Sequence, residues 1–326
     1  MTIIAGFDAA RVVRFTSVMP PQPTSSQPIY DWRILRAGRL WLDGGSMFGV
    51  VPKAIWSRLV APDEHNRIPL QTNCLLLSPS ASGSAGGSAK ARAATDPRAE
   101  PGANGFILIE TGFGSKWTDK ERGFYDLERR DVAEALREID VAPHQIAHVI
   151  VTHLHFDHAA GLTRLNEKGE AVPTFPNADV FVQRLEWSDA LANKSTMNRT
   201  YLRDHLDPIA DRVHLVDGEK EVLPGITAWP MPGHTWGQQA VRFNDAQGTV
   251  VFAGDVLPTV NHVGLPFSLA YDMEPYTSML SKKHLYEQAI AGDWRLALDH
   301  EPGAHVVFRV REDASTKGKF TLEPAT

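Results

Sequence analysis

The sequence has only one cysteine, Cys74, among its 326 residues, and it has no long uninterrupted apolar run. A single cysteine excludes an internal disulfide, and the apolar residues around Cys74 predict a buried position on a strand. No stretch approaches the roughly 18 consecutive apolar residues of a membrane span, and residues 1–29 lack the apolar segment of a signal peptide. We therefore expect a cytoplasmic protein without a membrane partner.

The sequence also lacks an excess of basic residues. Its formal net charge is -6, and its isoelectric point is about 6.1. Proteins bind nucleic acids mainly through Lys and Arg, so this balance argues against a nucleic-acid partner and against a nuclease. Hydrophobic residues make up 43% of the chain, which is enough to build a sizeable core.

The chain is expected to form one domain preceded by an arm. Residues 1–29 become rich in Pro and Ser toward their end, a composition that resists regular structure. Residues 30–326 carry a succession of apolar segments and are predicted to form a single domain. Within it, residues 78–105 are rich in Ser, Ala and Gly, and we interpret them as a flexible insertion between two neighbouring strands.

Short apolar segments predict the strands of this domain. They occupy residues 30–42, 70–77, 106–111, 146–152, 180–182, 213–216, 239–243, 249–253, 294–298 and 306–310. The sequence Asp-Gly-Gly at 43–45 predicts a turn after the first of them. Apolar positions spaced three and four residues apart predict a helix over 127–139, and further helix-like segments cover 184–192, 198–207 and 275–291. This mixture of strands and helices favours layered sheets covered by helices.

The most informative motif is Thr-His-Leu-His-Phe-Asp-His-Ala-Ala-Gly at residues 152–161. It places four side chains of metal-binding type, His153, His155, Asp157 and His158, within six positions at the end of an apolar run. Alternate residues of an extended chain point the same way, so His153 and His155 can present two imidazoles to one ion. The turn that follows directs Asp157 and His158 toward a second position.

Three further candidate ligands follow at the ends of separate apolar segments: His234 in Pro-Gly-His-Thr, Asp255 in Ala-Gly-Asp, and His300 in Leu-Asp-His. Because the short spacing already fixes four ligands, distant strand ends can supply the others at little entropic cost. Seven nitrogen and oxygen ligands are enough for two divalent metal ions. Imidazole and carboxylate ligands favour zinc, and they are also compatible with iron, manganese or cobalt.

This series of motifs resembles that of the metallo-β-lactamase superfamily over residues 30–310. The resemblance implies a four-layer αββα sandwich, in which two mixed β-sheets are flanked by helices and the metals lie at one edge between the sheets. The ligands that it implies are His153, His155 and His234 for the first metal, Asp157, His158 and His300 for the second metal, and Asp255 as a bridge between them.

Three segments are similar to a narrower branch, the quorum-quenching lactonases that also resemble methyl-parathion hydrolases. They are residues 42–53, 152–163 and 269–272. Two other positions differ from the family pattern. Glu110 precedes Thr-Gly where an Asp usually supports the site, and Pro258 stands where better-known acyl-homoserine-lactone lactonases have a Tyr that helps the leaving group. His262 or Tyr271 would have to replace that Tyr.

The resemblance predicts a hydrolase that opens lactones or esters, with N-acyl-homoserine lactones as the leading small-molecule substrates. Metals lower the pKa of bound water from about 15.7 to near 7, so the predicted nucleophile is a hydroxide that bridges the two ions. We predict catalytic roles for Asp157, which is expected to move a proton, for Asp255, and for His262. The residues expected by resemblance to form the substrate-binding wall are Met47, Phe48, Val50, Phe267 and Tyr271.

The sequence leaves three alternatives to this interpretation. The same site could hydrolyse aryl esters or organophosphate triesters, because hydroxide also attacks phosphorus readily. An iron-dependent redox enzyme could use the same fold, and a metal-binding protein without catalytic activity could use the same ligands. Similar enzymes often form homodimers, so a second copy of the chain is a possible partner.

Overall fold

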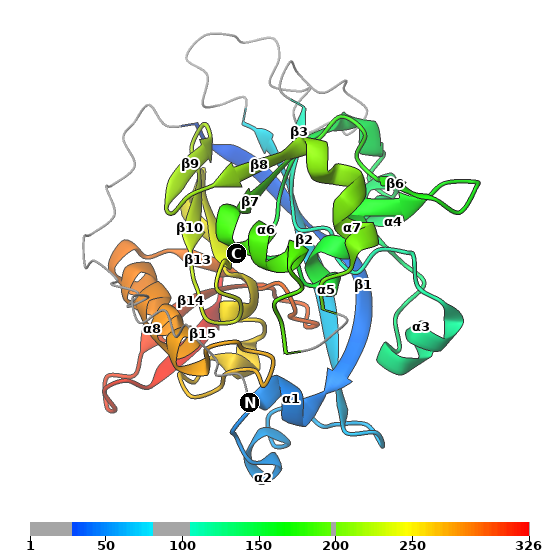
Figure 1. The fold of residues 1–326 in the computed structure, drawn as a ribbon. Helices are drawn as coiled ribbons and strands as arrows, with labels where there is room; N and C mark the ends of the chain where they lie inside the picture. The colour runs from blue at the N-terminus through cyan, green and yellow to red at the C-terminus, as the bar shows by residue number, and fades with distance from the viewer. Residues whose placement is uncertain (1–27, 81–104, 197–199, 326) are drawn as a thin grey trace, which may run out of the picture.

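The computed structural model of the protein describes residues 28–80, 105–196 and 200–325. Two main sheets lie face to face and helices cover their outer faces, which confirms the αββα arrangement predicted from the sequence (Figure 1). The predicted arm over 1–29 and the predicted insertion over 78–105 lie almost wholly outside the described residues. At the start of that insertion, Ser78 and Pro79 still belong to a strand.

The first sheet has six strands in the order β1-β2-β3-β4-β7-β8. They are β1 (Tyr30–Asp43), β2 (Arg67–Pro79), β3 (Phe106–Ile109), β4 (Ile146–Ile150), β7 (Asp179–Gln183) and β8 (Val213–Val216). Strands β1 to β3 pair antiparallel, whereas β3, β4, β7 and β8 pair in parallel. The carboxyl ends of parallel strands share one edge, and the predicted metal motif begins at that edge.

The second sheet has seven strands in the order β15-β14-β13-β12-β11-β10-β9. They are β9 (Lys220–Leu223), β10 (Ile226–Pro230), β11 (Gln239–Asp245), β12 (Gly248–Phe252), β13 (Arg295–Ala297), β14 (Val307–Glu312) and β15 (Phe320–Pro324). Only β12 and β13 pair in parallel among these neighbours. The sequence pattern missed β9, β10 and β15, because their apolar stretches are short and contain polar or charged residues. Strands β5 (Thr163–Leu165) and β6 (Ala171–Pro173) form a separate small hairpin.

Helices cover the outer face of each main sheet. Helices α4 (Val132–Arg137), α6 (Arg184–Leu191) and α7 (Arg203–Leu206) share a buried apolar cluster with the first sheet, and α8 (Pro275–Gly292) shares one with the second. The predicted helix over 127–139 is shorter in the structure, because the side chain of Asp131 caps α4 by accepting a hydrogen bond from the N–H of Glu134. Among the described residues, none of the helices combines the length and the apolar character that a membrane span needs.

The shorter helices lie mainly in loops around the carboxyl ends of the strands. They are α1 (Gly44–Phe48), α2 (Lys53–Trp56), α3 (Asp119–Tyr125) and α5 (Phe156–Ala159), with 3-10 turns η2 (Pro143–Gln145), η3 (Ala160–Leu162), η4 (Asp207–Arg212), η5 (Gly254–Val256) and η6 (Val260–His262). The turn predicted at 43–45 is therefore wrong. Asp43 instead begins α1, because its Oδ1 accepts the N–H of Ser46 at 2.7 Å.

Apolar side chains from both sheets fill the space between them. Leu75 and Ile107 of the first sheet belong to the same buried cluster as Val241 and Phe252 of the second. Burying each such side chain contributes about 1.5–3 kcal/mol, so this layer holds the two sheets in fixed register. Cys74 points to the helix side of the first sheet and is fully buried, which confirms its predicted packing role. The edge that carries the metal motif is thus built on a rigid frame.

Candidate metal centre

The first four predicted ligands directly follow strand β4. The strand ends at Ile150, and helix α5 begins at Phe156 with His155 as its N-terminal cap. The imidazole of His153 lies with its centroid 4.5 Å from that of His155 and 4.0 Å from that of His158. His158 lies in the single turn of α5 together with Asp157. A strand end followed by a short helix therefore turns the four side chains inward.

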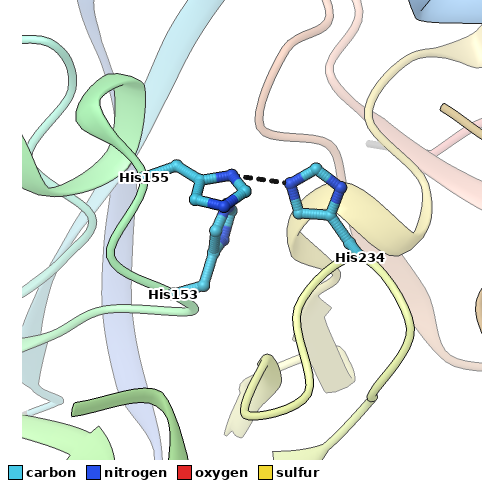
Figure 2. Close-up of side chains that lie close together, drawn as sticks. All are labelled: His153, His155 and His234. Carbon is cyan, nitrogen blue, oxygen red and sulfur yellow. Dashed lines mark hydrogen bonds between the residues drawn. The ribbon is translucent and has the colours of Figure 1, made fainter. Parts of the chain in front are cut away.

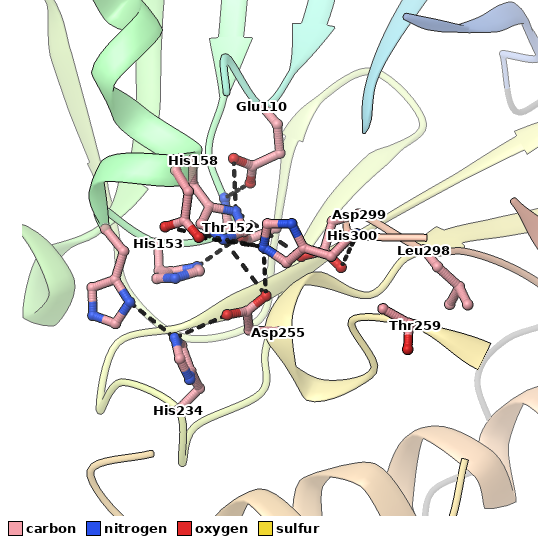
Figure 3. Close-up of polar contacts among 12 residues, drawn as sticks. Glu110, Thr152, His153, His158, His234, Asp255, Thr259, Leu298, Asp299 and His300 are labelled. Carbon is pink, nitrogen blue, oxygen red and sulfur yellow. Dashed lines mark hydrogen bonds and ion pairs between the residues drawn. The ribbon is translucent and has the colours of Figure 1, made fainter. Parts of the chain in front are cut away.

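The other three predicted ligands come from loops of the second sheet. His234 follows β10, Asp255 lies in η5 after β12, and His300 follows β13. Nε2 of His234 lies 2.9 Å from Nδ1 of His155, and Nε2 of His300 lies 3.1 Å from Nε2 of His158. The structure thus brings all seven predicted ligands together at one edge of the two sheets. Of these ligands, Figure 3 labels His153, His158, His234, Asp255 and His300.

The ligand atoms form two adjacent groups. The first group consists of His153, His155 and His234 (Figure 2), and the second consists of His158, Asp255, Asp299 and His300. Within each group the ligand atoms lie within 4.8 Å of one another. Asp255 connects the groups, because its Oδ2 lies 3.1 Å from Nε2 of His234 and its Oδ1 lies 3.2 Å from Nε2 of His300.

The second group differs in one member from the set predicted by resemblance. It contains Asp299, which was not predicted as a ligand, in place of Asp157. Oδ2 of Asp299 lies 4.0 Å from Nδ1 of His158, on the outer side of that ring. Asp157 instead faces the inner nitrogens, with its oxygens 3.9 Å from Nε2 of His158 and 3.6 Å from Nε2 of His300. Asp157 is therefore the carboxylate better aimed at a metal between these imidazoles.

Asp299 was missed because its only sequence signal is that it directly precedes His300. Neighbouring residues in a loop need not point into the same site, so its position beside His300 did not predict a ligand. The fold places Asp299 at the site. Its main-chain carbonyl oxygen accepts the N–H of Asn73 in β2, and its carboxylate is buried beside His158.

The trihistidine group has the chemistry of a metal site. Nε2 of His153 is buried and has no hydrogen-bond partner among the described residues. Burying such an atom without a partner costs about 1–3 kcal/mol, and a cation would remove that cost. Burial, followed by the neighbouring imidazoles, holds the pKa of His153 and of His155 well below the usual range. Both rings are therefore neutral, which is the form that binds a metal.

The second group lies in a negative electrostatic field. Burial by itself would lower the pKa of His158 and of His300, but the carboxylates outweigh it. Asp157 and Asp255 raise the pKa of His158, and Asp299 and Asp255 raise that of His300 to about 9. Burial would also raise the pKa of Asp255, yet the surrounding imidazoles hold it well below its usual range. Such a field favours a cation, and the two groups together fit a pair of divalent ions.

Outer hydrogen bonds set the orientation of the ligand imidazoles. Nδ1 of His234 lies 2.8 Å from Oδ1 of Asp272, and Nδ1 of His300 lies 3.0 Å from the carbonyl oxygen of Gln71. A carbonyl oxygen only accepts, so Nδ1 of His300 donates and Nε2 is left to face the centre. The carboxylate of Asp272 does the same for His234. Asp272 belongs to the segment 269–272 that resembles the lactonase branch, and its contact with His234 gives it a positioning role.

Glu110 supports the site at the position where the family usually has an Asp. Its φ of 68° lies in a region that few residues other than glycine adopt. Its Oε1 accepts the N–H of Thr152 at 2.6 Å, and its Oε2 lies 3.3 Å from Nδ1 of His158. This longer carboxylate therefore connects the start of the metal motif to the outer nitrogen of one of its histidines.

An open pocket leads to both groups. Its lining residues are Leu42, Met47, Tyr125, His155, Phe156, Asp157, Ser195, Thr196, Thr200, His234, Asp255, Tyr271 and His300. Apolar and aromatic side chains form one part of the wall, and hydroxyl groups from the segment around Ser195 form another. Met47 and Tyr271 therefore line the pocket as predicted for the substrate wall.

The structure places the other three residues of the predicted wall elsewhere. Phe48 is fully buried between the rings of Trp56 and His262, with centroids 5.4 and 4.6 Å away. Val50 is 81% exposed, because Gly49 ends helix α1 with a φ of 54° and turns the chain outward. Phe267 packs edge-on against Phe48 and does not line the pocket. Phe48, Val50 and Phe267 therefore do not form the substrate wall that the resemblance predicted.

Replacing Phe48 with alanine is expected to lower the free energy of unfolding by about 3–5 kcal/mol, because the change empties a buried stacked position. The KM of long-chain and short-chain substrates should change by the same factor. Chemical denaturation measures the first effect, and Ile55→Ala on the adjacent exposed helix surface is the control. A selective rise in KM for long chains, with stability unchanged, would restore Phe48 to the substrate wall.

His262 does not reach the pocket, so its predicted catalytic role is not supported. The ring is fully buried, and both nitrogens are occupied. Nδ1 lies 2.7 Å from the hydroxyl of Thr259, and Nε2 donates to the carbonyl oxygen of Met47 at 2.8 Å. Burial, together with the nearby Lys282, lowers the pKa of His262 to about 3. A neutral ring in this position holds the Met47 main chain in place and cannot protonate a leaving group.

The two adjacent ligand groups at the edge of an αββα sandwich are consistent with a dinuclear metal site in a protein of that architecture. Residues 100–299 match the sequence profile of the Metallo-beta-lactamase superfamily. The chain belongs to that superfamily, as its motifs predicted.

Curated relatives match part of the chain. An N-acyl homoserine lactonase of Bacillus thuringiensis is 28% identical over 168 residues, which are 48% of this chain and 59% of that protein. A "probable metallo-hydrolase" of Mycobacterium tuberculosis is 27% identical over 177 residues, which are 47% of this chain and 53% of that protein. The chain thus spans somewhat more than half the length of these relatives.

Solved structures match over most of the chain. A "probable metal-dependent hydrolase" from Staphylococcus aureus superposes with a TM-score of 0.74 at 26% identity and covers 92% of this chain and 99% of its own. AidC, described as a dizinc quorum-quenching lactonase in complex with a product, superposes with a TM-score of 0.68 at 17% identity, covering 92% and 99%. At that identity the likeness to AidC concerns the fold.

Proposed function

We propose that the protein is a dinuclear metal-dependent hydrolase that opens lactones or esters, with N-acyl-homoserine lactones as the leading substrate class. The observation that carries this proposal is the carboxylate of Asp255, which lies between the two ligand groups and lines the pocket. A shared carboxylate at the base of an open pocket is suited to hold two cations beside a bound substrate. The distant homology to N-acyl homoserine lactonases supports the choice of substrate.

We propose zinc as the metal in both sites. Three imidazoles without a carboxylate of their own form the first group, and zinc accepts such a donor set readily. The description of AidC as a dizinc enzyme of the same fold supports the same choice. Two bound divalent ions would supply a water of lowered pKa and would polarise the carbonyl of the substrate.

The side chains of the pocket divide the remaining tasks. Asp157 faces both the pocket and the second ligand group, so its carboxylate can take up the proton that the attacking water loses. The apolar side chains of Leu42, Met47 and Phe156 offer a surface for an acyl chain, and excluding water there strengthens the polar contacts at the centre. Tyr271 lies in the same wall, and its phenol would donate a proton to the departing oxygen of the substrate.

One observation favours a second candidate reaction. The aromatic rings of Tyr125 and Phe156 belong to the pocket wall and lie 5.2 Å apart, so an aryl group could pack against them. Aryl esters and organophosphate triesters with aryl leaving groups are therefore the alternative substrates.

The deciding experiment compares the two substrate classes on protein of known metal content. We expect kcat/KM for an N-acyl-homoserine lactone of suitable acyl length to fall in the enzymatic range of about 10⁴–10⁸ M⁻¹s⁻¹ and to exceed the value for paraoxon. A series of acyl lengths finds the preferred lactone, and metal-free protein serves as the control. Faster hydrolysis of paraoxon would select the alternative, and no turnover of any lactone by the dimetal protein would refute the proposal.

A further inference from the structure

Helix α6 contributes a buried acidic residue that the proposed mechanism does not use. Glu186 is fully buried, and burial raises the pKa of its carboxyl group. Its Oε1 accepts the main-chain N–H of Leu154 at 2.9 Å, and its Oε2 accepts the hydroxyl of Thr235 at 2.6 Å. The hydroxyl of Tyr201 also donates to Oε1, at 3.1 Å. A buried carboxylate that accepts three hydrogen bonds is held rigidly in place.

Two of these donors belong to the two loops that carry the first ligand group. Leu154 stands between His153 and His155, and Thr235 directly follows His234. Figure 2 shows that these three histidines come from two separate segments, and Nε2 of His234 lies 2.9 Å from Nδ1 of His155. One carboxylate therefore joins the two segments immediately behind the metal-facing imidazoles.

The loop after His234 is also packed tightly against α6. A Cβ atom at Gly237 would lie only 2.3 Å from the main-chain nitrogen of Glu186, closer than real Cβ contacts allow. Any other residue would push the loop away from the helix. The contact between Glu186 and Thr235 thus depends on a close approach of main chain to main chain that glycine permits.

The same carboxylate reaches the polar wall of the pocket. The ring of Tyr201 lies 5.2 Å from the ring of His155, and the preceding residue, Thr200, lines the pocket. A second contact joins the same two segments. Lys194 directly precedes Ser195 of the pocket wall, and its Nζ lies 3.9 Å from the ring of Trp236 in the loop after His234. The segment that provides the pocket hydroxyls is therefore tied to the loop of His234 at two points.

We infer that Glu186 is a positioning residue that holds His153, His155 and His234 at ligand spacing and ties the polar pocket wall to them. The inference rests on the proposed dinuclear function, because it requires the trihistidine group to bind a metal. Metal affinity at this group should thus depend on a residue that does not touch the metal.

The test measures metal affinity site by site. Glu186→Gln keeps the size of the side chain but cannot accept a hydrogen bond through its amide nitrogen. Thr235→Val removes only the bond to the His234 loop, and Tyr201→Phe removes only the bond to the pocket wall. Ser188→Ala, on the exposed face of the same helix, is the matched control. Competition with a chromophoric chelator gives the zinc affinities, and the visible spectrum of the cobalt-substituted protein reports the ligand geometry.

We expect Glu186→Gln to weaken one of the two zinc sites by about 10–100-fold, the usual effect of losing an outer partner of a metal ligand. Thr235→Val should weaken the same site by a smaller factor, and Ser188→Ala should leave both sites unchanged. In a His300→Ala background, which damages the second group, Glu186→Gln should weaken the zinc that is left. The spectrum of cobalt at this site should change as well.

Unchanged zinc affinities and cobalt spectra in both Glu186→Gln and Thr235→Val would overturn the inference. Equal weakening of both sites, together with a lower Tm of the metal-free protein, would also overturn it, because that result indicates a general loss of structure. If Glu186→Gln does not fold, Thr235→Val decides by the same criteria. None of these readouts uses a substrate, so a failure of the lactonase proposal with intact zinc binding is distinguishable from a failure here.

Discussion

Replacing Asp255 with alanine is expected to reduce turnover by more than about 100-fold, beyond the usual cost of losing an outer partner of a ligand. The carboxylate reaches both sets of ligands, with its oxygens 3.1 Å from Nε2 of His234 and 3.2 Å from Nε2 of His300. Without it, two divalent ions would lie close together among neutral imidazoles, and their mutual repulsion would be poorly screened in a buried site. Metal content should therefore fall along with activity.

Elemental analysis after dialysis, combined with steady-state kinetics, measures both effects of Asp255→Ala. Asp211→Ala is the control, because Asp211 is an exposed acidic residue outside the site. A variant that binds as much metal as the unchanged protein and hydrolyses the substrate at the same rate would refute the assignment of Asp255 as the bridge. Retained metal with lost activity would restrict its role to the reaction itself.

Replacing Tyr271 with phenylalanine is expected to lower kcat by about 100-fold, the lower range for removing a general acid. Tyr271 lines the pocket together with Asp157, and the Ser46 hydroxyl hydrogen-bonds to its phenol oxygen. Burial raises the pKa of Tyr271 to about 12, so the phenol keeps its proton throughout the neutral range. A protonated phenol beside the ligand groups can donate to the oxygen that leaves the substrate, a task for which Pro258 offers no group.

The kinetic pattern separates this role of Tyr271 from simple packing. The kcat of Tyr271→Phe should fall while KM stays near that of the unchanged protein, and the loss should be smaller for esters with acidic leaving groups, which need less protonation. Because the pKa of Tyr271 is about 12, its deprotonation should not reduce activity below about pH 11. Tyr125→Phe, at another position of the same pocket, is the control. Equal losses in both variants would argue that neither hydroxyl acts on the leaving group.

The sequence allowed a nearly complete prediction of the ligand set. His153, His155, Asp157 and His158 are so close in sequence that a strand end and one helical turn suffice to bring them together. Local geometry therefore predicted half of the centre without any knowledge of the sheets. The motif series of the superfamily then identified His234, Asp255 and His300, which the structure places within hydrogen-bonding distance of that first set or of one another.

The residues that orient the ligands could not be predicted in the same way. Glu186, Asp272 and Asp299 each lie far along the chain from the histidine that they support or adjoin, or beside it with no distinctive pattern. Their roles depend on which loops meet at the edge of the sandwich. A single acidic residue in a sequence carries no sign of burial, since most acidic residues are exposed.

The substrate wall shows most clearly what resemblance alone leaves undecided. Met47, Phe48 and Val50 were all predicted to face the substrate. In the structure Met47 lines the pocket, Phe48 is enclosed by aromatic rings, and Val50 faces solvent. Three neighbours in a short helix and its terminal turn must point in different directions, because successive side chains rotate around the helix axis. Which of them meets the pocket is decided by packing against Trp56 and His262.

The sequence by itself determined the superfamily, the layered fold and the residues able to bind two metals, because the order and local spacing of its motifs resemble those of the superfamily and its apolar segments predict the strands. The tertiary structure alone decided that Asp299 lies beside His158, that His262 is enclosed away from the pocket, and that Glu186 joins the two loops of the trihistidine group. The physical reason is that such contacts form between segments distant in sequence, and only the packing of the two sheets fixes their separation.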